Sequence, residues 1–396
     1  MRTAGIPMPS ALVIACSLFC EYTQCLIKVY VGKDARVFAL QYCIGSRRIE
    51  EIDYLLKRNI SIWSFALIVC SLIQMTIAAF ANSSAPSPLI RLSPDVVPKH
   101  YSIDLTINPG AIDFSGVVKI ELTLAREKKS IVLHAADFSY DRIELHSGSV
   151  SQTATVQKRD SDGTIELNFI NAVGPGDVTL EFIYHAPFST GLEGLYKVVD
   201  NGSAAVFTQF EAIGARRAFP CFDEPSFKAP FDISLKVPQK LVAISNTRET
   251  NKTDNVDGFV THRFATTKPL PTYLIAIAAG DFDVVEAQSI PPSDWRKEAV
   301  PLRGIAMRGK GEDLRIALNY TAKLVLAEEK YFGIAYPFDK LDIIAVPDFG
   351  AGGMENAGAI TYDESIVFLD DDSTLQRRRD FQIGRASCRE RVCYPV

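Results

Sequence analysis

A glycine-rich run that ends in a carboxylate is the part of this sequence that most directly indicates chemistry. It reads Gly352-Gly353-Met354-Glu355-Asn356 and follows an apolar stretch, 341–346, that is typical of a β-strand. Glycine has no Cβ atom, so a ligand can approach the backbone of Gly352 and Gly353 closely. The carboxylate of Glu355 follows at once and is placed to hold a cation. We therefore treat residues 352–356 as a candidate binding site.

A second motif lies earlier in the chain and supports a specific interpretation. It contains Thr208-Gln209-Phe210-Glu211-Ala212 and continues as Ala215-Arg216-Arg217-Ala218-Phe219-Pro220-Cys221-Phe222-Asp223-Glu224-Pro225. The two motifs, in this order, resemble the hallmarks of the zinc aminopeptidases related to alanyl aminopeptidase and leukotriene A4 hydrolase. In that family the later motif has the form Gly-x-Met-Glu-Asn. The resemblance covers residues 94–382, nearly all of the body of the chain.

The resemblance implies a substrate and a role for the residues of both motifs. The substrate is a peptide with a free N-terminus, whose α-amine Glu355 holds. Glu211 is the second acidic arm, and Gln209 lines the first specificity pocket. The peptide backbone would lie along the glycines like an added β-strand. The residues expected to bind substrate are Glu355, Glu211, Gln209, Gly352, Gly353, Met354 and Asn356.

These residues also have purely structural interpretations. Glu355 fits an exposed turn residue, and Glu211 fits the solvated face of a strand. The two arginines of the second motif are expected to brace the domain by pairing with its carboxylates, and two histidines in β-patterns are expected to be ordinary strand residues. The residues concerned are Arg216, Arg217, Asp223, Glu224, His134 and His185.

The zinc site that the resemblance implies is not found in this sequence. In the family, zinc is held by H-E-x-x-H on a helix and by a further glutamate, because histidines at i and i+4 share one helix face. No two histidines of this chain have that spacing, and none follows residue 356. The five histidines are His100, His134, His146, His185 and His262. We expect no metal ligand and no catalytic residue in this chain, and zinc only in the full-length protein.

The last residues do not fit the family either. The zinc helix is expected about thirty residues past the signature glutamate, near the end of this chain. The sequence there reads Gln382-Ile383-Gly384-Arg385-Ala386-Ser387-Cys388-Arg389-Glu390-Arg391-Val392, which resembles a translated sequencing adapter. We interpret residues 384–396 as an artefactual tail and the chain as a fragment cut just before its metal site. Such a fragment should hydrolyse no peptide.

Charge and cysteine placement exclude several other classes. The formal net charge of −5, with charges interspersed, argues against nucleic acid or an anionic membrane surface as the main partner. Of eight cysteines, five precede residue 82 and two lie in the tail. Only Cys221 remains in the body, so no disulfide within the body is available. We expect it to be a buried, small apolar residue.

The N-terminal region has the pattern of an export signal. Lys57 and Arg58 precede an apolar run, 60–80, which closes with Ala79-Phe80-Ala81. A basic start, an apolar stretch and an A-x-A end indicate a signal peptide cleaved after Ala81, although the run is also long enough to be a membrane anchor. Either interpretation exports the protein, to the periplasm or the secretory route. Residues 1–59 would then be a doubtful upstream segment and 82–97 a linker.

The body of the chain predicts an α+β fold. Apolar and polar residues alternate in several stretches, which marks strands with one buried face: 101–107, 118–124, 165–169, 178–184 and 231–237. Residues 273–278 are expected to form a continuous apolar strand, and 311–332 a helix capped by Gly333. The resemblance implies a large antiparallel β saddle or sandwich, 98–284, followed by the beginning of a thermolysin-like mixed α/β catalytic domain, 285–383.

Three functions remain open at this point. The first is an exported zinc aminopeptidase represented by an incomplete gene model. The second is a non-catalytic peptide-amine-binding or scaffold protein, and the third a purely structural β-sandwich. The third leaves the joint occurrence of the two motifs unexplained, and an end inside an apparent helix start favours the first over the second. No oligomeric state follows from the sequence.

Overall fold

The computed structural model describes residues 16–21, 24–31, 36–42 and 91–369. The chain divides into two units, residues 1–88 and 89–396. In the first unit, three strands form an antiparallel sheet in sequence order: β1 (Cys16–Glu21), β2 (Gln24–Val31) and β3 (Arg36–Tyr42). The predicted signal peptide or anchor at 60–81 and the tail at 384–396 lie outside the described residues.

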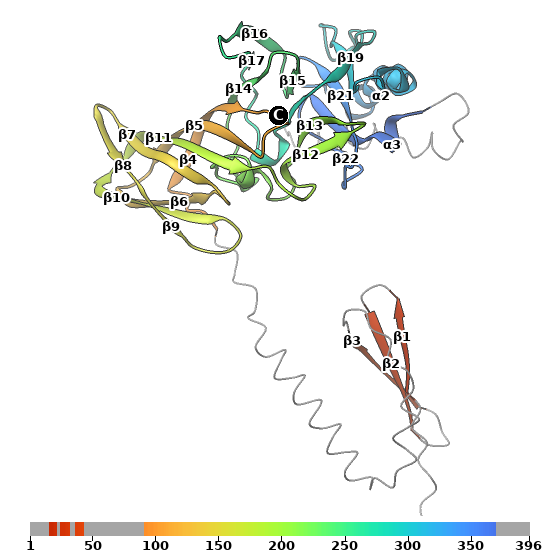
Figure 1. Ribbon diagram of the computed structural model, residues 1–396, viewed down its shortest axis with the longest axis horizontal. Coiled ribbons are helices and arrows are strands. Elements are labelled where there is room, and N and C mark those ends of the chain that lie inside the picture. Colours follow the sequence, from red (N-terminus) through yellow and green to blue (C-terminus); the bar gives the residue numbers. More distant parts are fainter. Residues whose placement is uncertain (1–15, 22–23, 32–35, 43–90, 370–396) are drawn as a thin grey trace, which may run out of the picture. The chain divides into compact units, whose positions relative to one another are not determined.

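The second unit contains an eight-stranded sheet in the order β16-β17-β14-β4-β5-β11-β7-β8 (Figure 1). All neighbouring strands are antiparallel except β14 and β4, which run parallel. Every second residue of the central strands is buried, as the period-two pattern predicts. The strands are β4 (Val96–Thr106), β5 (Asp113–Leu124), β7 (Ser139–Ser147), β8 (Val150–Thr153), β11 (Gly176–Pro187), β14 (Phe231–Pro238), β16 (Glu249–Asp254) and β17 (Phe259–Phe264).

A smaller sheet shares one hydrophobic core with this large one. It has the order β6-β10-β9, formed by β6 (Lys128–His134), β10 (Thr164–Val173) and β9 (Thr155–Lys158). Ile131 and Leu167 of the small sheet belong to the same buried cluster as Ile120 and Phe182 of the large sheet. The predicted antiparallel β-sandwich is therefore confirmed.

A four-stranded sheet, β12-β13-β18-β15, follows and corrects one prediction. Its strands are β12 (Gly194–Asp200), β13 (Ser203–Gln209), β15 (Val242–Ser245) and β18 (Ile277–Gly280). The strand expected over 273–278 begins only at Ile277, because Thr272–Leu274 forms a 3-10 turn (η3). Between that turn and β18, Ile275 N bonds to the backbone oxygen of Thr272, whereas Ile275 O and both backbone groups of Ala276 bond to side chains.

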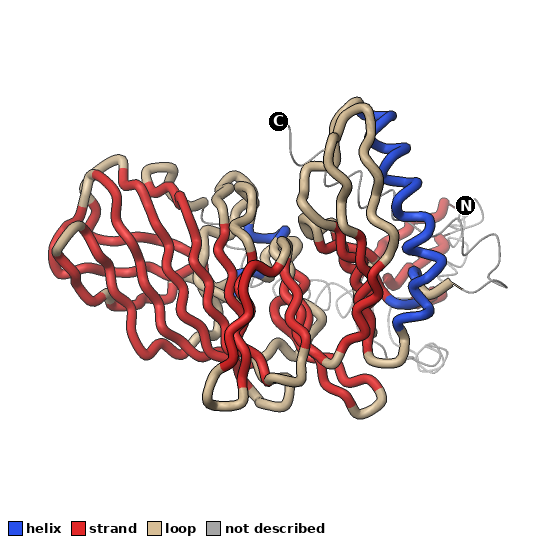
Figure 2. The backbone as a smooth tube through the Cα atoms, turned by 90° about the horizontal axis from the view of Figure 1, so that it is seen from above, coloured by secondary structure: helices blue, strands red, loops and turns tan. Residues whose placement is uncertain are grey.

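The last sheet has five strands and mixed direction, as predicted for the second part of the body. Its order is β19-β20-β21-β23-β22, and the pairs β20/β21 and β21/β23 are parallel. Helix α2 (Arg315–Phe332), preceded by the 3-10 turn η4 (Gly311–Leu314), packs on one face (Figure 2), and Gly333 ends it with φ of 67°. The remaining elements are β19 (Phe282–Glu286), β20 (Leu302–Met307), β21 (Leu341–Val346), β22 (Gly353–Met354), β23 (Ala359–Asp363) and α3 (Glu364–Val367).

The other face of the five-stranded sheet shares a core with the four-stranded sheet. Phe207 and Ala278 from the four-stranded sheet lie in one buried cluster with Ile344 and Met354 from the five-stranded sheet. The backbone of Gly358, whose φ is 67°, lies close to the backbone of Asn246. A Cβ atom added there would lie 2.5 Å from the carbonyl oxygen of Asn246. This position therefore requires glycine for both its conformation and its lack of a side chain.

The second sequence motif folds into a buried polar hub. Arg216 Nε donates to Asp223 Oδ2 at 2.9 Å, and Thr272 Oγ1 donates to Asp223 Oδ1 at 2.5 Å. The backbone N–H of Asp223 donates to Nδ1 of His134 at 3.1 Å. All four side chains are buried. The expected bracing by Arg216 is confirmed, and His134 is a structural acceptor on a strand.

The neighbouring motif residues lie at the edge of this hub. Arg217 pairs with Asp137 at 3.1 Å instead of a carboxylate of its own motif, and Glu224 pairs with Arg91 at 3.4 Å. Arg217 was thus assigned the wrong partner, because Asp137 comes from a loop distant in sequence. Cys221 is buried and has no disulfide, as predicted, and burial raises the pKa of its thiol.

The close contact at Gly358 predicts a large effect of a single methyl group. We expect Gly358→Ala to lower the free energy of unfolding by about 2–4 kcal/mol, since a positive φ and a backbone clash both oppose it. Gly309→Ala is the matched control, because Gly309 has φ of 88° but no atom within 4 Å of an added Cβ. It should cost only about 1–2 kcal/mol. If urea unfolding showed the same loss of stability in both variants, the backbone clash at residue 358 would be contradicted.

The buried His134 predicts a pH dependence of stability. Burial, and then the charge of Arg216, lower the pKa of His134 from 6.5 to about 3. Below pH 6.5 the unfolded chain therefore takes up a proton that the folded chain refuses, and stability falls as the pH falls toward 3. Between pH 7 and 5 this loss is about 2 kcal/mol. His134→Asn, which keeps an acceptor near Nδ1, should lose that much less stability in urea unfolding. A variant that loses as much stability as the wild type over this pH range would contradict His134 as the source.

Candidate functional site

The glycine-rich run forms the edge of the five-stranded sheet. Gly352 has φ of 72°, and Gly353 and Met354 form β22, which pairs with Tyr362 and Thr361 of β23. In the described part of the chain, no strand pairs with the outer side of β22, which is last in the sheet order. Such an edge offers backbone N–H and C=O groups to an incoming extended peptide.

The acidic and amide residues that follow this edge strand are buried. Glu355 is 3% exposed and Asn356 is 0% exposed, so Glu355 is not the exposed turn residue of the alternative interpretation. Asn356 is held from two sides, since its Nδ2 donates to Ile275 O at 3.2 Å and its Oδ1 accepts from Thr361 at 3.3 Å. The negative charge of a carboxylate suits Glu355 to hold a cationic group through charge-assisted hydrogen bonds.

The earlier motif places its two candidates at the end of β13. Gln209 is 6% exposed, and its Oε1 accepts no hydrogen bond from any residue that the structure describes. Glu211 follows in a turn, is exposed, and precedes Ala212 through a cis peptide bond. Exposure fits both an accessible ligand group and a solvated residue, so the role of Glu211 as the second acidic arm stays a prediction.

A short backbone segment, Leu274–Ile277, lies between the two motifs, and we call it the spine. Thr208, next to Gln209, accepts from Ile277 N at 2.9 Å and donates to Ile277 O at 3.3 Å. Asn356, next to Glu355, donates to Ile275 O. Each motif is therefore fixed to the spine by the residue beside its candidate ligand group, at spine residues only two positions apart.

Two further polar side chains hold the spine, and the sequence analysis missed both. Ser245 Oγ donates to Ala276 O at 3.0 Å, and Asn246 bonds to Leu274 and Ala276. Their sequence signal is slight: they are polar residues at the end of the apolar strand β15. Only the fold brings them beside the spine, some thirty residues later in the chain.

The described residues do not fit a zinc ion. No group of three or more His, Cys, Asp or Glu side chains in residues 91–369 is arranged to hold a metal. The histidines instead lie near carboxylates singly or serve as acceptors: His134 with Asp223 N, His262 with Glu249 at 2.6 Å, His100 with Asp232 at 3.2 Å and His185 with Asp141 at 3.0 Å. We derive no step through zinc from these residues.

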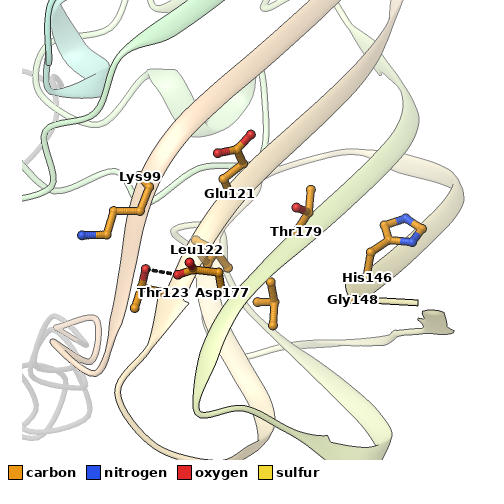
Figure 3. A pocket seen from close by; sticks show the side chains of 9 residues that line it. Lys99, Glu121, Leu122, Thr123, His146, Gly148, Asp177 and Thr179 are labelled. Carbon is orange, nitrogen blue, oxygen red and sulfur yellow. Dashed lines mark hydrogen bonds between the residues drawn. The ribbon is translucent and has the colours of Figure 1, made fainter. Parts of the chain in front are cut away.

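A surface hollow on the eight-stranded sheet is separate from both motifs (Figure 3). It has a volume of about 470 Å³ and is lined by residues of β4, β5, β7 and β11 and by Gly148. Thr123 and Asp177 at its floor bond to each other at 2.6 Å. No residue of either motif lines it, so its position gives no support to a role in peptide binding.

Comparison with known proteins agrees with the two motifs. Residues 97–274 match the Peptidase M1 N-terminal domain, and residues 316–383 match the Peptidase family M1 domain. Puromycin-sensitive aminopeptidase of Caenorhabditis elegans is 31% identical over 312 residues, 76% of this chain and 32% of the relative. Aminopeptidase M1 of Arabidopsis thaliana is 34% identical over 292 residues, 71% of this chain and 32% of the relative. The chain thus spans about a third of the length of these relatives.

The comparison contradicts the prediction of an exported protein. The relatives that bear on this prediction are the worm puromycin-sensitive aminopeptidase, the plant aminopeptidases M1 and M1-D and the bacterial aminopeptidase N. The prediction relied on an apolar pattern at 60–81, which lies outside the described residues. Among the residues that the structure describes, no helix is long and apolar enough to cross a membrane.

One relative is matched over most of its own length. Aminopeptidase N of Acetobacter pasteurianus is 31% identical over 298 residues, which cover 73% of this chain and 80% of the relative. Identity over so large a share of both chains, together with the two family domains in their expected order, leaves the family in no doubt. The chain belongs to peptidase family M1.

Proposed function

We propose that residues 91–369 form the amine-recognising part of an aminopeptidase that removes residues from the N-terminus of peptides. The observation that carries this proposal is the position of Glu355, a buried carboxylate directly behind an edge strand that has no strand partner in the described residues. A peptide added to the outer edge of β22 would bring its leading end to this carboxylate. The free amine would then fix the position of the peptide along the edge of β22.

The other motif completes the proposed site. Glu211 is accessible at the end of β13 and would contact the same ammonium group, whose positive charge offsets the repulsion between two carboxylates. Gln209 carries a buried oxygen that accepts no hydrogen bond from the described residues, which suits it to meet the first side chain or the backbone of a substrate. The spine holds both motifs at a fixed separation.

The hydrolytic step lies outside what these residues can perform. The family resemblance implies zinc, which when bound supplies a polarised carbonyl and an activated water. The described side chains do not fit that ion, so we assign them only the binding and orientation of the peptide. We propose that zinc belongs to the full-length protein.

Removal of the charge of Glu355 provides the test. A charge-assisted hydrogen bond contributes about 1.5–3 kcal/mol, or roughly tenfold to a hundredfold in affinity. We expect Glu355→Gln to weaken binding of a free-amine fluorescent peptide to the 396-residue chain by that factor and to leave the N-acetylated peptide unchanged. In the full-length protein, Glu355→Ala should lower kcat/KM for free-amine substrates at least about tenfold.

The test of Glu355 has a control variant and a result that would contradict it. Asp177→Asn removes a carboxylate from the surface hollow, which no residue of either motif lines, and should change neither affinity. An equal loss for free-amine and N-acetylated peptides would contradict the proposed role of Glu355, because the acetylated peptide has no ammonium group to hold.

A further inference from the structure

We propose that Asn246, a residue of the N-terminal β domain, is the positioning residue that fixes residues 355–358, here called the Glu355 loop, in their binding geometry. This inference rests on the proposed function and extends it to a side chain outside both motifs. Asn246 directly follows β15 and is 2% exposed. It does not belong to the sheet that carries Glu355.

The side chain of Asn246 bridges the spine and the Glu355 loop. Its Nδ2 donates to Leu274 O and to Ala357 O, both at 2.9 Å, and its Oδ1 accepts from Ala276 N at 2.9 Å. Ala357 is two residues after Glu355. Both amide hydrogens and the carbonyl oxygen are thus used, a set of groups that only a primary amide supplies in this geometry.

The backbone of Gly358, next to Ala357, is also held by contacts on both the Asn246 side and the side of the five-stranded sheet. Gly358 lies against the carbonyl oxygen of Asn246, closer than any side chain would permit. The carbonyl oxygen of Gly358 accepts from Lys340 Nζ at 2.7 Å and from Asp342 N at 3.1 Å. Residues 357–358 therefore contact Asn246 and are also hydrogen-bonded to Lys340 and Asp342 at the five-stranded sheet.

This arrangement gives Asn246 control over the spacing of the two motifs. Thr208, the neighbour of Gln209, bonds to the spine, and Asn246 links the same spine to Ala357. Loss of the amide would leave three buried backbone groups without their partner and free the loop to shift relative to Gln209. Because a displacement of about 1 Å can cost a hundredfold in a positioned site, the recognition of the amine should weaken.

The test compares the preference of variants for a free amine. Asn246→Ala removes all three hydrogen bonds, and Asn246→Asp keeps an acceptor for Ala276 N but loses both amide donors. Thr247→Val is the matched control, because Thr247 bonds to Ala265 O and contacts neither the spine nor the loop in the hydrogen bonds described. The readout is the ratio of dissociation constants for a free-amine fluorescent peptide and its N-acetylated form, measured on the 396-residue chain.

This ratio separates positioning from stability. Partial unfolding lowers the apparent affinity for both peptides by the same factor, so it leaves the ratio unchanged. We expect Asn246→Ala and Asn246→Asp to reduce the preference about tenfold, and Thr247→Val to keep it within about twofold.

Each other result has a definite meaning. A wild-type preference that survives in both Asn246 variants would overturn the positioning role and leave the proposed function standing. The same loss in Thr247→Val would assign the effect to general loosening after β15 and would also overturn that role. No preference in the wild-type chain would instead refute the proposed function itself.

Discussion

The hydrogen bonding of the spine is the constraint on which the candidate site depends. Buried backbone N–H and C=O groups must find partners, and most do so in helices or between strands. In Leu274–Ile277 side chains supply many of them, and these side chains come from parts of the chain far apart in sequence: Thr208, Ser245, Asn246 and Asn356. A shift of the spine would therefore break its hydrogen bonds to these four side chains.

The hub of the second motif extends this constraint. Thr272, which opens the η3 turn just before the spine, donates to Asp223, and Asp223 in turn accepts from Arg216. The upstream end of the spine is therefore fixed by one family motif and its middle by Asn356 of the other. The hub thus helps to hold the spine, to which the candidate residues of both motifs are attached.

Sequence periodicity sufficed for the regular elements and failed where tertiary contacts override local preference. The alternation at 101–107 and 178–184 gave the correct strands, and Gly333 marked the helix end, because each signal is local. Residues 273–276 are as apolar as a strand, yet the η3 turn and distant side chains satisfy their backbone groups, so no pattern could exclude a strand there. The candidate residues could be found as motifs, but the role proposed for Asn246 depends on its contact with Ala357, 111 positions later in the chain. Export was wrongly inferred because an apolar stretch alone does not fix a destination.

The parallel pairing of β14 with β4 has a consequence for synthesis on the ribosome. Tyr101 lies opposite Phe231, so 231 − 101 = 130 residues must be added before β4 acquires its second neighbour. At about 5–20 residues per second this takes on the order of 10 s. Once β5 has been made, the outer edge of β4 stays open until β14 follows, and an open edge is a template for pairing with other nascent chains.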